Sequence, residues 1–156
     1  MSEEEKLDKK NQEDIEKYWE EKEQEIGEKI IGKDMSEYLG GFGELKEKLW
    51  GLLYYSQKAF YFQTFPRRSW FASLLGMGGE RNQNDVVNFR IMWLKVKDIY
   101  LPARKKSLLS FLSPTDYRVF IKYQIDNKED TLVFAMYSSK SRDKFVDCYN
   151  QSKQNI

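Results

Sequence analysis

The sequence predicts an α+β protein, in which a mainly β domain with one closing helix follows an acidic helical leader. Three observations support this prediction. Residues 1–30 are rich in Glu and place apolar residues at helical spacing. The middle of the chain alternates apolar and polar residues between short polar turns, which is typical of strands. The last residues return to helical spacing, and strands followed by a single helix favour an α+β module over a βαβ array.

The size of the chain suits one domain with an appendage. It has 156 residues, and single domains commonly need roughly 100–150. We expect residues 1–39 to form a partly disordered acidic leader and residues 40–156 to form the domain. Aromatic residues make up 15% of the chain, so the domain can fill a core with large rings.

The leader is expected to become ordered after its charged start. Residues 2–11 have Leu7 as almost their only apolar residue and are predicted to be disordered. From Glu13 to Ile31 the pattern predicts an amphipathic helix. Its apolar face must cover something: its own domain, which we favour, a second copy in a dimer, or a partner's groove. The residues predicted to make this contact are Ile15, Trp19 and Ile26.

A flexible junction is predicted between the leader and the domain. Gly32 and then three glycines around Phe42 interrupt the pattern, and glycine permits backbone conformations that break regular structure. We place the domain boundary near residue 40.

Aromatic-rich strands are predicted to follow. Residues 45–55 and 58–65 read as two strands, with a short break at Ser56-Gln57 that suggests a hairpin. Two further strands are expected at 86–93 and 96–101.

The clearest strand is predicted at 117–125, where apolar residues alternate strictly. The polar turn 126–130 follows, and 131–137 is its expected hairpin partner. Ser138 and Ser139 then offer an N-cap for a terminal helix whose apolar residues recur at helical spacing.

The composition argues against an enzyme and against a metal or cofactor site. The chain has no His and one Cys, which excludes Ser/His and Cys/His pairs and any zinc site built from these residues. Carboxylates, lysines and tyrosines remain, but no catalytic motif joins them. The lone Cys148, the hydrophilic start and the lack of a long apolar run together predict a cytoplasmic protein.

Charge is divided unevenly along the chain. Residues 1–30 hold twelve acidic and six basic residues, a net charge of −6, whereas the rest of the chain has a net charge of +7. Two interpretations stay open: the leader masks a basic face of the domain, or it is a solvated helix that keeps the chain soluble.

The segment from Gly51 to Phe62, GLLYYSQKAFYF, resembles the first hairpin of GRAM and bacterial pleckstrin-homology-like (PH-like) domains. The similarity extends over about residues 44–152. It implies a bent β-sandwich or partial barrel of about seven strands with a C-terminal capping helix, in a superfamily that binds phosphoinositides, peptides or proteins. Further residues that fit are Phe89-Arg90-Ile91, Asp98-Ile99, Arg142, Phe145 and Tyr149.

Two segments place basic residues directly before apolar ones and are the candidate site for a lipid or a partner. In loops at one end of the sandwich, their cations could meet anionic headgroups while the aromatic rings enter the membrane interface. In the alternative interpretation, the apolar residues belong to the core and the cations are solvated beside them. The candidate residues are Arg67, Arg68, Trp70, Phe71, Arg104, Lys105 and Lys106.

The preferred function is a noncatalytic PH-like module that binds protein or peptide partners. Its candidate surfaces are the sheet edges, the groove beside the last helix and the leader helix. The alternative is a peripheral adaptor that docks on anionic membranes. The turn Ser56-Gln57-Lys58 has one base, which argues against specific inositol phosphate recognition, and the net charge of +1 argues against nucleic acid. Self-association through the leader helix stays open.

Overall fold

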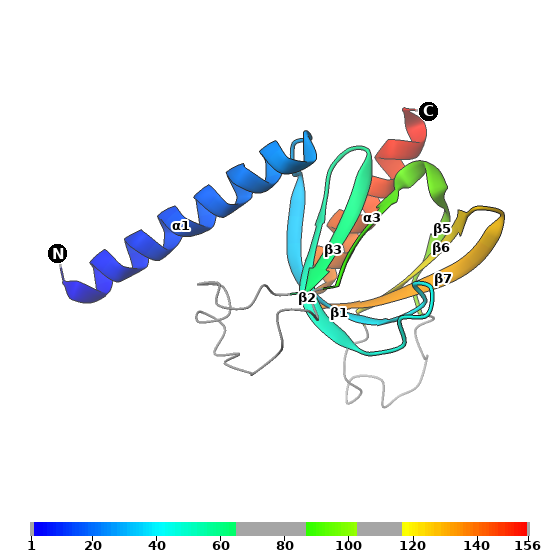
Figure 1. The fold of residues 1–156 in the computed structure, drawn as a ribbon, viewed down its shortest axis with the longest axis horizontal. Coiled ribbons are helices and arrows are strands. Elements are labelled where there is room, and N and C mark those ends of the chain that lie inside the picture. Colours follow the sequence, from blue (N-terminus) through cyan, green and yellow to red (C-terminus); the bar gives the residue numbers. More distant parts are fainter. Residues whose placement is uncertain (1, 65–86, 103–116, 156) are drawn as a thin grey trace.

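The computed structural model describes residues 2–64, 87–102 and 117–155. Within these ranges, seven strands form one antiparallel sheet in the order β4-β3-β2-β1-β7-β6-β5, and its two edge strands do not pair with each other (Figure 1). The elements are α1 (Glu3–Ile26), β1 (Gly32–Gly40), β2 (Leu49–Tyr55), β3 (Ala59–Thr64), β4 (Asn88–Met92), the 3-10 turn η2 (Trp93–Lys95), β5 (Val96–Tyr100), β6 (Arg118–Ile125), β7 (Lys128–Met136) and α3 (Ser139–Gln154).

The leader helix begins ten residues earlier than predicted. Helix α1 starts at Glu3, because Ser2 and Glu5 form a capping box in which each side chain accepts a hydrogen bond from the other's backbone N–H. Acidic residues in the first turn also stabilise the helix, because their negative charges lie at the positive end of the helix dipole. The helix ends at Gly27, whose φ of 70° is a left-handed conformation that glycine adopts readily.

Much of the segment predicted to be a flexible junction forms strand β1 instead. It lies at the centre of the sheet between β2 and β7, so the sheet includes residues on both sides of the expected boundary at residue 40. The hairpin of Gly51–Phe62 is consequently the second hairpin and not the first. Strand β1 was not predicted from the sequence because only one of its buried residues, Tyr38, is large and apolar. The other two are Gly32 and Ser36.

The other predicted elements are present with shifted ends: β2 begins at Leu49 and not at residue 45, and β7 begins at Lys128 and not at residue 131. The β2–β3 hairpin turns at Ser56–Lys58, as expected. Asp126 and Asn127 have φ values of 52° and 64°, and this polar turn joins β6 to β7. Ser138 caps α3 by accepting a hydrogen bond from the Ser141 backbone N–H at 3.1 Å.

Large rings fill the inner face of the sheet. Phe60, Phe62 and Phe134 have no exposed surface, and Phe145 of α3 reaches the same cluster. Its ring meets those of Tyr55 and Phe60 edge to face, an arrangement that adds to the free energy gained by burial. Helix α3 therefore closes the core, and it packs against η2, β1 and β7.

The outer face of β2 and β3 has a smaller cluster of its own. Trp19 of α1 packs there with Leu52, Tyr54, Ala59 and Tyr61. Figure 1 shows that only the C-terminal part of α1 reaches the sheet, while its N-terminal part projects away from the domain. No helix among the described residues is both long and apolar enough to cross a membrane.

Candidate functional site

The basic and aromatic residues predicted to bind a lipid or a partner lie outside the described residues. The first group falls between Thr64 and Val87, and the second between Pro102 and Tyr117. At the first gap the flanking strands are joined, because the Thr64 backbone N–H donates to the Val87 carbonyl at 2.9 Å. The role of the residues themselves stays a prediction: they are Arg67, Arg68, Trp70, Phe71, Arg104, Lys105 and Lys106.

The leader residues predicted to make a contact lie on the outer face of the sheet. Trp19 is 6% exposed, and its ring centroid lies 5.5 Å from that of Tyr54. Ile15 and Ile26 pack against the same cluster. The Lys33 ammonium lies 4.8 Å from the centre of the Trp19 ring, within the range of a cation–π contact. A dimer through these three leader residues would first have to displace them from the chain's own sheet.

Glu28 joins the end of the leader to the sheet. Its carboxylate accepts hydrogen bonds from the Ser56 hydroxyl and, at 3.4 Å, from the Tyr61 hydroxyl. The Arg90 guanidinium lies 3.6 Å from the other carboxylate oxygen. Burial, followed by the charge of Glu28, raises the pKa of Tyr61. The contact fixes Ser56, whose carbonyl accepts a hydrogen bond from the Trp93 indole in a nearby groove.

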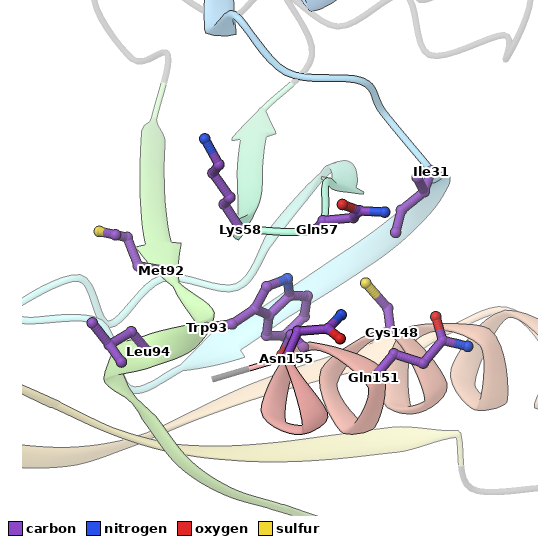
Figure 2. A pocket seen from close by; sticks show the side chains of 10 residues that line it. Ile31, Gln57, Lys58, Met92, Trp93, Leu94, Cys148, Gln151 and Asn155 are labelled. Carbon is purple, nitrogen blue, oxygen red and sulfur yellow. The ribbon is translucent and has the colours of Figure 1, made fainter.

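This groove lies between the β2–β3 turn, η2 and the C-terminal end of α3, and we call it the α3 groove. Its volume is about 360 Å³, within the range of small-molecule and side-chain pockets. Figure 2 shows the Trp93 indole at its centre, with the turn on one side and α3 on the other. Its lining residues are Ile31, Gln57, Lys58, Met92, Trp93, Leu94, Cys148, Gln151, Ser152 and Asn155.

The floor of the α3 groove is fixed by hydrogen bonds. The Trp93 indole N–H donates to the Ser56 carbonyl at 2.9 Å, and the Cys148 thiol lies 3.5 Å from the same oxygen. The Trp93 backbone N–H donates to the Lys58 carbonyl at 2.9 Å. The Ser56 hydroxyl in turn accepts from the backbone N–H groups of Lys58 and Ala59. The groove is therefore pre-organised, which lowers the entropy lost when a ligand binds.

The rim of the α3 groove combines exposed apolar side chains with carboxamides. Met92 is 40% exposed and Leu94 is 60% exposed, although both are large apolar residues. Gln57, Gln151 and Asn155 bring amide groups, each of which can donate and accept hydrogen bonds. Such a rim can hold an apolar group and pair with the backbone of a bound segment.

The thiol of Cys148 in the groove is not activated as a nucleophile. Burial raises the pKa of Cys148 to about 11, so the thiol stays protonated and weakly reactive near neutral pH. Within the described ranges, no group of three or more acidic, His or Cys side chains could hold a metal ion.

At the other end of β2, the chain fills the corresponding space itself. Phe42, in the β1–β2 connection, stacks on Phe89 with 4.1 Å between ring centroids and 9° between ring planes. The Tyr38 hydroxyl holds this connection by donating to the Leu45 carbonyl at 2.7 Å and accepting from the Phe42 N–H at 2.9 Å. Tyr123 donates to the Gly41 carbonyl, also at 2.7 Å.

Comparison with solved structures shows the fold. The chain is similar to the C-terminal domain of an unknown protein from Leishmania infantum, with a TM-score of 0.50 and 12% identity, over 86% of this chain and 97% of that one. It is also similar to the DH/PH domains of PDZ-RhoGEF in complex with GTPγS-activated RhoA, with a TM-score of 0.51 and 8% identity, over 83% of this chain and 30% of that one.

The DH/PH domains of p115-RhoGEF are similar as well, with a TM-score of 0.51 and 4% identity, over 81% of this chain and 31% of that one. The chain thus spans about a third of either RhoGEF chain. No family profile and no curated protein sequence matches it. Together, the sheet, the closing helix and these similarities show a PH-like fold, without distinguishing a GRAM domain from other domains of that fold.

Sequence reasoning pointed to the groove beside the last helix but missed most of the residues that form it. Met92 and Trp93 were predicted to end a strand, and Leu94 to follow it, whereas the structure turns at Trp93 and exposes Met92 and Leu94. A run of three large apolar residues between two short strands was the available signal.

Proposed function

We propose that this chain is a noncatalytic interaction module that binds a segment of a partner protein in the α3 groove. The observation that carries the proposal is the composition of this groove, a fixed apolar floor under a rim of exposed Met92 and Leu94 and three carboxamides. Exposed apolar side chains beside a pocket with a few polar groups are the usual mark of a binding site.

The polar groups of the rim favour a peptide over a lipid headgroup. A peptide group has one donor and one acceptor, and a carboxamide offers both. An anionic headgroup is commonly held by several cations, but Lys58 is the single charged residue in the lining. The alternative of membrane docking would therefore depend on the basic and aromatic segments outside the described residues.

The similar structures are compatible with a protein partner. The PDZ-RhoGEF DH/PH domains were solved in complex with activated RhoA, which is a protein. From this comparison we extend to the present chain only the proposal that its partner is a protein. The GRAM or bacterial PH-like type and the cytoplasmic location remain predictions from the sequence. The absence of His from the chain and the raised pKa of Cys148 support a noncatalytic role.

A peptide selection tests the proposal. The full chain, immobilised, would be used to select binders from a phage-displayed library of random dodecapeptides, and the affinity of synthetic binders would be measured by fluorescence polarisation. We expect Leu94→Asp to weaken binding by about tenfold or more, because it puts a charge on the apolar rim.

Tyr137→Asp is the matched control. Tyr137 is an exposed apolar residue, 55% against 60% for Leu94, but it does not line the α3 groove. Its substitution should change affinity by less than about twofold. Selection of no binder, or binders that tolerate Leu94→Asp as well as Tyr137→Asp, would reject the α3 groove as the binding site.

A further inference from the structure

The charge of Lys58 makes the proposed partner more specific. Several cations of this chain are paired: Arg90 lies 3.6 Å from Glu28, and Lys122 lies 2.9 Å from Glu129. Lys58, in contrast, forms no ion pair with any residue that the structure describes. It is exposed, and it is the single charge among ten lining residues.

The backbone of Lys58 is held in place, so its cation starts from a fixed point on the rim. Its N–H donates to the Ser56 hydroxyl at 3.1 Å, and its carbonyl accepts from the Trp93 N–H at 2.9 Å. Figure 2 shows the lysine side chain extending away from the indole that forms the floor. A ligand that covers Trp93 would therefore meet the ammonium at its edge and not beneath its centre.

The opposite wall has no charged lining residue. Gln151 and Ser152 belong to the last turns of α3, and Asn155 is its C-cap. The C-terminal end of a helix carries a partial negative charge, and the basic residue of this last turn, Lys153, donates to the Lys97 carbonyl at 3.1 Å and does not line the groove. An anionic group on the ligand should consequently lie on the side of the β2–β3 turn, next to Lys58.

On the basis of the proposed function, we propose that the partner segment carries a large apolar side chain with an Asp or Glu one or two residues away. The apolar side chain covers Trp93 between Leu94 and α3, and the carboxylate pairs with Lys58. This spacing follows from geometry, because an extended chain advances about 3.3 Å per residue, so one or two residues place the carboxylate about 3–7 Å along the rim, within reach of the flexible lysine side chain. The partner is therefore an acidic, apolar linear segment.

Three matched peptides test this inference against the full chain. Each is a fluorescein-labelled dodecapeptide of Gly, Ser and Ala with two central leucines, and the positions two residues to either side carry Glu, Gln or Lys. We expect the Glu peptide to bind about three- to fivefold more tightly than the Gln peptide, as for an exposed ion pair, and the Lys peptide to bind most weakly. Added salt should reduce this difference.

Substitutions of Lys58 show whether this residue is responsible. Lys58→Gln should abolish the preference for Glu over Gln, and Lys58→Glu should make the Lys peptide the best of the three. Lys46→Glu, at an exposed lysine beyond the other end of β2, should leave the order unchanged. Circular dichroism of each variant checks that its fold is kept.

The outcomes separate this inference from the proposed function. Equal binding of all three peptides, still weakened by Leu94→Asp, would overturn the acidic preference and leave the α3 groove as a peptide site. A preference for Glu that survives Lys58→Glu would also overturn the role of Lys58. Failure of every peptide, together with failure of the library selection, would overturn both proposals.

Discussion

The two ends of β2 differ in how the chain closes the space above its aromatic core. Near Leu49, Phe42 folds back and stacks on Phe89, so the chain supplies its own cover. Near Tyr55, α3 and Trp93 cover the core but leave the α3 groove open, with Leu94 exposed beside it. The connection of the chain thus covers one end of the core, whereas the other end has the opening that we propose as a binding site.

The contrast also concerns charge. The β1–β2 connection carries Glu44, Lys46, Glu47 and Lys48, two acidic and two basic residues that cancel. The α3 groove has Lys58 alone. Among the described residues, the charges of the β1–β2 connection therefore cancel, whereas the lining of the α3 groove carries one cation. The following predictions test whether the two ends are as independent as this comparison implies.

The largest effect is expected at the floor of the groove. Trp93→Ala should lower the free energy of unfolding by about 3–5 kcal/mol, because a 2% exposed ring is lost next to Phe60 and Phe145. Trp93→Phe keeps a ring and loses the hydrogen bond to Ser56, at a cost of about 1–3 kcal/mol. Urea denaturation measures both. Equal losses for the two variants would contradict a packing role for the indole.

A smaller effect is expected at the closed end. Phe42→Ala should lower the free energy of unfolding by about 1–3 kcal/mol, less than Trp93→Ala, because Phe42 is only partly buried. The affinity of any peptide that binds the α3 groove should stay within about twofold of its original value. Urea denaturation and fluorescence polarisation test the two statements. A tenfold loss of affinity would show that the two ends are coupled.

Alkaline pH should weaken the groove end first. Burial raises the pKa of Cys148 from 9.0 to about 11, so the unfolded chain releases its thiol proton at lower pH than the folded chain. The resulting stability is complete below pH 9 and is lost as the pH rises to about 11. We expect a loss of about 1–2 kcal/mol over this interval.

Cys148→Ala provides the control for this pH dependence. It should remove the loss between pH 9 and 10 and reduce the loss between pH 10 and 11. The remaining loss begins near pH 10, because burial also raises the pKa of Tyr123 from 10.0 to about 12. Urea midpoints at a series of pH values give both curves. Identical curves for the two proteins would mean that Cys148 does not contribute.

The smallest effect is expected from the segments proposed for membrane docking. If the α3 groove is the binding site, Arg67→Glu and Trp70→Ala should each change peptide affinity by less than about twofold. Cosedimentation with anionic and neutral liposomes, at low and physiological salt, tests the alternative. Salt-sensitive binding to anionic liposomes that either substitution weakens would favour the membrane adaptor.

Much of the fold could be predicted because most strands alternate visibly. The pattern of β6 is strict, and its inward residues Val119, Ile121 and Tyr123 are buried as expected. Strand β1 could not be found in this way. Its central position is decided by pairing with β2 and β7, in which the small Ser36 lies opposite Gly51 and Met136. Tertiary context determines such a strand more than its own residues do.

The candidate site was predictable only in outline. A terminal helix packed on strands suggested a groove, but its walls come from three distant parts of the sequence. Sequence spacing shows which face a residue occupies and does not show which turn will meet α3. Trp70 and Arg67 were predicted as site residues from the composition of their segment. Trp93 and Lys58 can be identified only from the residues that surround them in the structure.

The reach of α1 offers a practical use. The helix is 24 residues long, and its buried residues, Trp19 and Lys22, lie in its second half. The helix axis from Glu3 to Trp19 is therefore ~24 Å long, at roughly 1.5 Å per residue. A fluorescent protein fused to this helix so that the helix continues without a break would rotate together with the domain and not independently of it. Binding in the α3 groove could then be followed by anisotropy without a label near the site.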